Sequence, residues 1–243
     1  MRTAAILQAR MGSTRLPGKV LMRAAGLPLL QHELERVSRA TRVDEIVVAT
    51  TRESADDPIA ALCRKLGYRC MRGDEADVLG RYAEAAKACQ ADAIVRLTGD
   101  CPLIDPAVID RVASAFLDRS SPVDYASNTL VRTDPRGLDT EVFSAEALQR
   151  TAREAKHAAE REHVTRYMYR HPDRFRLLNV PGTRDLHEHR WTVDTTEDFE
   201  LVSRILAALY SQQPHFGTSD VLALLDRNPS WLSINAHIAQ KDN

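Results

Sequence analysis

The first half of the chain alternates short apolar runs with amphipathic patterns, at intervals of roughly 20–25 residues. Short runs rich in Val, Ile, Leu and Ala are typical of buried strands, whereas apolar positions three and four apart are typical of one helix face. Their alternation predicts an α/β fold in which helices cover both faces of a largely parallel sheet. We expect strands at residues 4–9, 45–51, 68–72 and 92–100, and helices at residues 28–40, 56–67, 77–90 and 105–118.

Two helix ends are marked by single residues. Gly67 follows an amphipathic run and is well placed to end a helix in the left-handed conformation. Asp105 precedes Pro106, and this pair favours a helix with an aspartate N-cap and proline in its first position.

The second half of the chain breaks this rhythm. Residues 139–155 predict a short strand followed by a helix, residues 161–172 a helix stopped by Pro172, residues 174–180 and 189–194 two strands, and residues 196–210 a long helix. No Gly/Ser/Pro-rich linker separates the halves, so we expect a single domain over residues 1–243, elaborated after about residue 120.

Composition excludes several classes of protein. A net charge of −1 gives no broad field for nucleic acid, and no apolar run approaches the length of a membrane span. The cysteines lack zinc-site spacing, which favours reduced thiols, and we expect a cytoplasmic protein. They are Cys63, Cys70, Cys89 and Cys101.

The stretch "RMGSTRLPGK" at residues 10–19 follows the first apolar run directly. It is not a dinucleotide-binding fingerprint, because Gly12 and Gly18 have no glycine between them. It is not a P-loop either, because Val20 follows Lys19 where the P-loop has a hydroxyl residue.

The same stretch still offers what a phosphate needs. Its glycines free backbone N–H groups, and its hydroxyls and cations add further donors at the carboxyl edge of the sheet, where α/β folds bind ligands. The alternative is a solvated turn whose cations face water. The donors are Arg10, Gly12, Ser13, Thr14, Arg15, Gly18 and Lys19.

Two aspartates end strands at the same edge. Asp100 closes the run "AIVRLTGD", and Asp194 closes "RWTVD". Mg²⁺ prefers one or two carboxylates and completes its shell with water or phosphate oxygens. The alternatives are that Asp100 only closes a turn before Pro102, and that Asp194 only caps a helix starting at Thr195.

The motifs "QARMGSTRLPGKVL", "VVATT", "RGDEADVLGRY", "TGDCPLIDP", "GLDTEVFS", "EREHVT" and "TVDTTEDFELV" resemble those of the SpsF-type cytidylyltransferases of spore coat polysaccharide biosynthesis. These are similar to CMP-Kdo synthetases and acylneuraminate cytidylyltransferases. The resemblance covers about residues 3–205. It implies a mixed, mainly parallel sheet of the nucleotide-diphospho-sugar transferase (GT-A-like) fold, CTP as a substrate, Mg²⁺ as the cofactor and a homodimer.

The resemblance also implies roles for individual residues. Asp100 and Asp194 would bind the metal, and Arg10, Arg15, Lys19 and Asp100 would be the catalytic set. Ala49, Thr50 and Thr51 would contact the cytosine or ribose region. The implied nucleotide-binding residues are Gln8, Ala9, Gly12, Ser13, Ala49, Thr50, Thr51, Arg72, Gly73, Arg81 and Gly99.

The second substrate is expected to meet residues about 120–190, which would also carry the dimer contacts. Arg161 and Arg190 could pair with a carboxylate, which suits an acidic sugar of the 2-keto-3-deoxy or nonulosonic type. For each of these residues the alternative is an ion pair within the protein. The candidates are Asn128, Asp139, Glu141, Arg161, His163 and Arg190.

The sequence therefore predicts a nucleotidyltransferase that moves CMP from CTP to a hydroxyl of an acidic sugar and releases pyrophosphate, for surface polysaccharide biosynthesis. One rival is a glycosyltransferase that consumes a nucleotide sugar, although the DxD motif of such enzymes is missing. The other is a non-catalytic nucleotide-binding subunit, against which the presence of Lys19, Asp100 and Asp194 counts.

Overall fold

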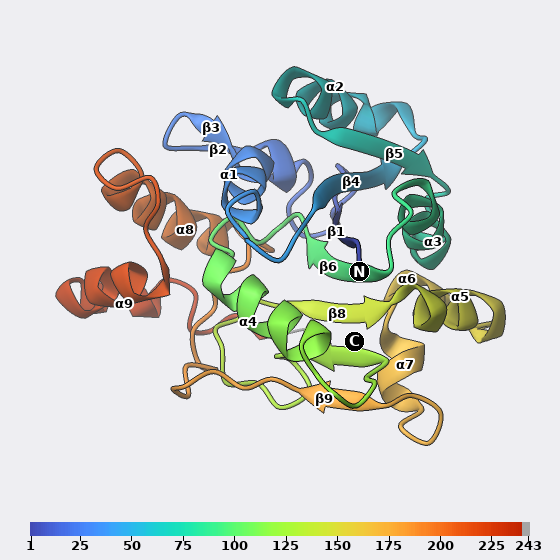
Figure 1. The fold of residues 1–243 in the computed structure, drawn as a ribbon. Coiled ribbons are helices and arrows are strands. Elements are labelled where there is room, and N and C mark those ends of the chain that lie inside the picture. Colours follow the sequence, from blue (N-terminus) through green and yellow to red (C-terminus); the bar gives the residue numbers. More distant parts are fainter. Residues whose placement is uncertain (240–243) are drawn as a thin grey trace.

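The computed structural model describes residues 1–239, and residues 240–243, the end of the predicted domain, lie outside the described part. One sheet runs through the molecule in the strand order β5-β4-β1-β6-β8-β7-β9 (Figure 1). Its strands are β1 (Thr3–Gln8), β4 (Glu45–Thr51), β5 (Arg69–Gly73), β6 (Ala93–Thr98), β7 (Tyr125–Ser127), β8 (Glu141–Ser144) and β9 (Leu177–Asn179). Arg23–Ala24 (β2) and Leu27–Pro28 (β3) form a separate small hairpin.

The sheet is mixed and mainly parallel, as predicted. Strands β5, β4, β1 and β6 run parallel to one another, β8 is antiparallel to β6 and β7, and β9 is parallel to β7. Gln8 at the end of β1 pairs with Ala49 and with Thr98. The loops that follow β1 and β6 therefore start side by side at one edge of the sheet.

Helices cover both faces, again as predicted. Apolar side chains of α1, α2, α4, α8 and α9 form a core on one face, and those of α3, α5 and α7 form a core on the other. The helices are α1 (Leu29–Val37), α2 (Asp57–Leu66), α3 (Val78–Ala88), α4 (Pro106–Leu117), α5 (Ala145–Glu154), α6 (Ala158–Glu162), α7 (Arg166–Arg170), α8 (Thr196–Leu209) and α9 (Thr218–Arg227). Within residues 1–239 no helix is long and apolar enough to cross a membrane.

The predicted helix ends are confirmed. Gly67 ends α2 with a φ of 79°. The Asp105 carboxylate accepts a hydrogen bond from the backbone N–H of Ala107 at 2.9 Å, with Pro106 in the first turn of α4.

Two predictions for the second half are wrong. Residues 161–172 do not form one helix, because Val164 has a φ of 49° and separates α6 from α7. Residues 189–194 are not a strand, since only Arg190 forms a bridge there, with Arg136. The backbone at Gly137 lies so close to Trp191 that a Cβ on Gly137 would be 2.6 Å from the carbonyl carbon of Trp191. The two segments therefore meet at one point around Arg136–Gly137 and Arg190–Trp191, and they do not pair along their length as two strands would.

Four elements, β2, β3, β7 and α9, were not predicted from the sequence. The strands β2, β3 and β7 have only two or three residues each, which is too few to show an alternating pattern, and α9 lies in a part of the chain for which no element was expected.

Candidate active site

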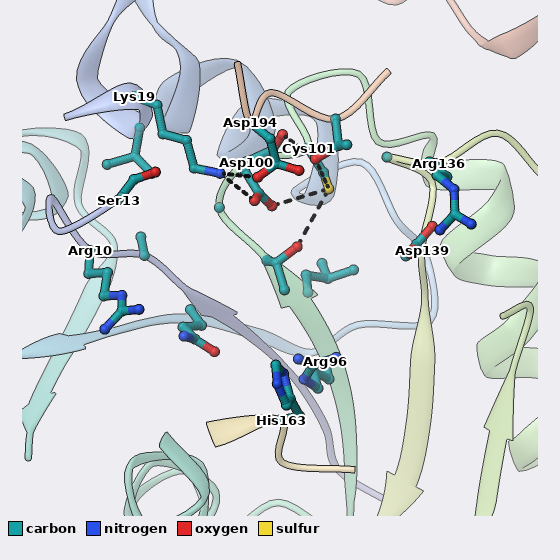
Figure 2. Close-up of a pocket in the computed structure, with 18 of the residues that line it drawn as sticks. Arg10, Ser13, Lys19, Arg96, Asp100, Cys101, Arg136, Asp139, His163 and Asp194 are labelled. Carbon is teal, nitrogen blue, oxygen red and sulfur yellow. Dashed lines mark hydrogen bonds and ion pairs between the residues drawn. The ribbon is translucent and has the colours of Figure 1, made fainter. Parts of the chain in front are cut away.

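A cavity of about 610 Å³ opens at the edge where β1 and β6 end (Figure 2). It is lined by the loop between β1 and α1, by the end of β6 and the turn after it, and by residues of the second half, of which Asp194 lies beside Lys19 and Asp100. Thirteen predicted site residues line it: Gln8, Ala9, Arg10, Gly12, Ser13, Arg15, Lys19, Gly99, Asp100, Asp139, Glu141, His163 and Asp194.

Lys19 joins the two predicted metal ligands. Its Nζ donates to Oδ2 of Asp100 at 2.7 Å and to Oδ1 of Asp194 at 2.9 Å, as Figure 2 shows. Burial alone would lower the pKa of the ammonium, but the charges of Asp100 and Asp194 outweigh burial and raise this pKa. Burial would raise the pKa of Asp100, but Lys19 outweighs it, so Asp100 is held as a carboxylate.

The loop that carries Lys19 is folded back on itself. The N–H groups of Ser13 and Gly18 both donate to the carbonyl oxygen of Met11, at 3.0 and 2.9 Å, and the Met11 N–H donates to Asp56 at 2.7 Å. Gly18 has a φ of 72°, which allows the sharp turn before Lys19. This geometry turns Arg15 and Lys19 inward, against the alternative of a solvated turn.

Asp194 contacts two further cations. Its Oδ2 lies 3.0 Å from Arg15 and 2.7 Å from Arg190. Its side chain is therefore used by these ion pairs and does not cap the following helix. Thr195 caps α8 instead, its Oγ1 accepting from the N–H of Asp198 at 3.3 Å.

Arg190 is not a wall of the cavity, contrary to the prediction that it binds the acceptor. It lies behind Asp194 and donates to Asp198 at 2.9 and 3.0 Å. Asp198 is fully buried and also accepts from Asn235 at 2.8 Å. Arg190 therefore holds Asp194 in place from the protein side.

The donor set fits Mg²⁺. Two carboxylates already reach one cation, and Mg²⁺ needs only one or two carboxylates when phosphate oxygens and water supply the rest of its shell. Among the described residues, no group of three or more His, Cys, Asp or Glu side chains lies close enough together to hold a metal ion.

Six predicted nucleotide-binding residues lie outside the cavity lining. Ala49, Thr50 and Thr51 are buried within β4 and support the neighbouring strands. Arg72 donates to Asp57 at 2.6 Å, and it also donates to the carbonyl oxygens of Thr51, at the end of β4, and of Glu53. The other two are Gly73 and Arg81.

Gly73 and Arg81 shape the loop between β5 and α3. A Cβ at Gly73 would lie 2.6 Å from the Arg81 side chain, so glycine makes room for this arginine. Buried Arg81 donates to the carbonyl oxygen of Glu75 at 3.0 Å, and Glu75 lies 3.6 Å from Arg10. These residues therefore shape the wall next to Arg10 and do not reach the cavity themselves.

The predicted acceptor residues are divided in the same way. Asp139, Glu141 and His163 line the cavity. Asn128 is buried and donates to Asp134 at 2.8 Å, and Arg161 pairs with Asp77 at 2.7 Å outside the cavity. For both, the alternative of a contact within the protein is the one found.

Several lining residues were not predicted from the sequence. Arg96 is a single charge within an apolar strand, and it forms an ion pair with Glu141, which also accepts from Tyr125 and from Thr165. That lone charge was the available signal for Arg96. The other unpredicted lining residues include Thr98, Cys101, Thr129, Arg132, Arg136, Gly137, Glu162, Thr165, Tyr169 and Thr192.

The family model described as Cytidylyltransferase matches residues 4–219. The chain belongs to the cytidylyltransferase family. The spore coat polysaccharide biosynthesis protein SpsF of Bacillus subtilis is 37% identical to this cytidylyltransferase over 92% of the chain and 94% of SpsF. The predicted resemblance is thereby confirmed.

Two solved structures extend the comparison. A cytidylyltransferase from Leptospira borgpetersenii serovar Hardjo-bovis is 33% identical, covers 100% of both chains and superposes with a TM-score of 0.92. CMP:2-keto-3-deoxy-manno-octonic acid synthetase complexed with CTP superposes with a TM-score of 0.62 at 20% identity, over 86% of this chain and 99% of that one. The latter shares the fold, and the predicted nucleotidyltransferase fold is confirmed.

Proposed function

We propose that this cytidylyltransferase moves CMP from CTP to a hydroxyl of an acidic sugar and releases pyrophosphate, with Mg²⁺ as cofactor. The observation that carries the proposal is the convergence of Asp100 and Asp194 on one cation beside a loop whose Arg10 and Arg15 also line the cavity. Carboxylates and cations side by side match a magnesium triphosphate.

Each group has a distinct task in this reaction. The acceptor hydroxyl loses its proton to solvent, and its oxygen forms a bond to the α-phosphorus while the bond to the leaving pyrophosphate breaks. Arg10, Arg15 and Lys19 bind the triphosphate and stabilise the charge that develops on pyrophosphate. Asp100 and Asp194 would hold Mg²⁺, which supplies charge neutralisation and lowers the pKa of the attacking hydroxyl. Catalysis is then positioning and electrostatics, without a covalent enzyme intermediate.

Arg136 supports an acidic acceptor. It lines the cavity next to Asp139, which Arg132 already engages through two hydrogen bonds of 2.5 and 2.8 Å (Figure 2). The Arg136 guanidinium has no hydrogen-bond or ion-pair partner within residues 1–239. Burial and, to a lesser extent, the charge of Arg132 lower the pKa of Arg136, because both disfavour its charged form. An anionic ligand beside the guanidinium would stabilise that charged form. Arg136 thus takes the role first expected of Arg161 and Arg190.

Three further features belong to the same proposal. The resemblance supports a place in surface polysaccharide biosynthesis and a homodimer with contacts in residues 120–190, and the pattern of cysteines in the sequence favours action in the cytoplasm. A glycosyltransferase would instead release a nucleoside diphosphate, and a non-catalytic subunit would bind CTP without turnover.

The test is pyrophosphate release with Mg²⁺, from each of the four nucleoside triphosphates, with eight- and nine-carbon 2-keto-3-deoxy sugar acids and their carboxamides. We expect turnover with CTP and an acid only. Arg136→Ala should raise the KM for the acid about 10- to 100-fold and leave the KM for CTP unchanged. The exposed Arg119→Ala is the matched control. Equal use of acid and carboxamide would reject the role of Arg136, and absence of CTP binding by calorimetry would reject the whole proposal.

A further inference from the structure

The carboxylates proposed to bind the metal are already occupied by side chains of the protein. Oδ1 of Asp194 and Oδ2 of Asp100 bind Lys19, and Oδ2 of Asp194 binds Arg15 and Arg190. Oδ1 of Asp100 lies 3.5 Å from the Cys101 sulfur. Three of the four oxygens therefore face a cation of the chain itself.

We propose that Lys19 and Arg15 act as built-in counterions that exclude a divalent metal from Asp100 and Asp194 until a nucleoside triphosphate draws them away. The inference rests on the proposed function, since it assigns the metal to these two carboxylates. A metal ion between them would occupy the space of the Lys19 ammonium and would be repelled by its charge.

The three cations on Asp194 differ in how they are held. Arg190 is tied to buried Asp198, which also binds Asn235, so Arg190 stays when ligands arrive. Arg15 and Lys19 belong to the loop after β1, and no hydrogen bond of either side chain reaches a described residue other than Asp100 and Asp194. A rotation of the Lys19 stem is enough to redirect its ammonium.

The triphosphate offers these two cations a new partner at the same place. Once Arg15 and Lys19 bind phosphate oxygens, the carboxylate oxygens that faced them become available to Mg²⁺. Binding of metal and of triphosphate must then strengthen one another by the same factor, because coupling between two ligands is reciprocal. The free enzyme is thereby kept from holding a metal without its nucleotide.

The test measures Mn²⁺ binding by electron paramagnetic resonance in the absence of nucleotide, so it does not depend on turnover. We expect weak binding to the wild-type protein and at least about tenfold tighter binding to Lys19→Met, since a charged hydrogen-bond partner is removed. Lys19→Gln, which keeps a polar side chain, should behave likewise. Lys65→Met, on the surface of α2, is the matched control and should bind as the wild type does.

A second arm measures CTP binding by calorimetry with and without Mn²⁺. Wild-type protein should bind CTP more tightly with the metal, and Lys19→Met should lose most of that gain. Unchanged Mn²⁺ affinity in both folded Lys19 variants would overturn the counterion proposal while leaving the proposed function intact. Failure of wild-type protein to bind CTP would instead reject the proposed function.

Discussion

At the scale of single residues, Arg190 shows how one side chain can be misassigned from sequence. It precedes Asp194 by four positions in a segment at the edge of the sheet, so an outward-facing role was a reasonable expectation. The structure directs its guanidinium to Asp198, which is fully buried. Removing one member of a buried ion pair leaves the other charge uncompensated.

We therefore expect Arg190→Met to lower the free energy of unfolding by about 3 kcal/mol or more. In the protein that remains folded, Mn²⁺ affinity in the presence of CTP should fall about 10- to 100-fold, because Asp194 loses its positioning partner. The KM for the acceptor should not change. Urea unfolding and metal titration check this. Arg161→Ala, which breaks a partly exposed pair with Asp77, is the control and should cost about 1 kcal/mol or less.

The place of Asp100 in the cavity could be predicted from the sequence, because parallel strands place their carboxyl ends at a common edge and Asp100 follows such a strand. Asp194 also lines the cavity, although the strand expected before it is replaced by a single bridge at Arg190. The partner of each arginine could not be predicted from the sequence. Arg96, Arg136, Arg161 and Arg190 carry the same group, and only the packing decides which of them faces a carboxylate of the protein and which faces the cavity.

At the scale of elements, the crossing of residues 136–137 with residues 190–192 replaces the strand expected at 189–194. The N–H of Arg136 donates to His189, and the N–H of Trp191 donates to the carbonyl oxygen of Arg136, at 2.9 and 2.7 Å. Gly137 makes this approach possible with a φ of 102° and no side chain. Alternating apolar and polar residues at 189–194 are compatible with a strand, and they could not reveal that this segment meets its neighbour at one bridge only.

Substitution of Gly137 should therefore cost more than left-handed strain alone. Gly67→Ala introduces a Cβ into open space at a φ of 79°, and we expect a loss of about 1–2 kcal/mol. Gly137→Ala adds overlap with the backbone of Trp191 and Thr192, and we expect a loss of about 2–5 kcal/mol. Urea unfolding of both variants checks this order, and equal losses would contradict it.

The pairing of β7 with β9 is reinforced by an ion pair just before each strand. Asp124 accepts from the Arg176 guanidinium at 2.8 and 2.7 Å and from its N–H at 2.8 Å. Hydrogen bonding to Arg176 lowers the pKa of Asp124 below its usual value. Because the folded state favours the charged form of Asp124, the ion pair stabilises the folded protein fully above about pH 4, the pKa of an aspartate in the unfolded chain. This stabilisation is lost as the pH falls through the lowered pKa of Asp124 in the folded protein.

Asp124→Asn should thus lower stability by about 1 kcal/mol at pH 7, a value discounted for the exposure of Arg176. The difference from the wild type should shrink steadily below pH 4. Thermal unfolding across this range measures it, with exposed Asp173→Asn as the control. A difference independent of pH would assign the effect to packing.

At the scale of the whole molecule, one sheet joins the two halves. Strand β6 of the first half pairs with β8 of the second, and the core on each face takes side chains from both halves. The missing linker favours such a continuity, and the single domain stays a prediction that unfolding can test. The reversal of β8 does not follow from its own residues, because strand direction is set by long-range pairing.

The cavity depends on the same continuity, since Asp100 belongs to the first half and Asp194 to the second. We expect a single cooperative thermal transition. CTP with Mg²⁺, at about 100 times the dissociation constant, should add about 2.7 kcal/mol to the free energy of unfolding and so raise the midpoint temperature by roughly 5–10 °C. Asp100→Asn should unfold cooperatively as well but show no such rise, because nucleotide and metal are no longer bound together. Differential scanning calorimetry decides the matter. Two separate transitions, only one of them moved by the ligands, would mean that one half binds the nucleotide without the other and that the molecule is not one unit.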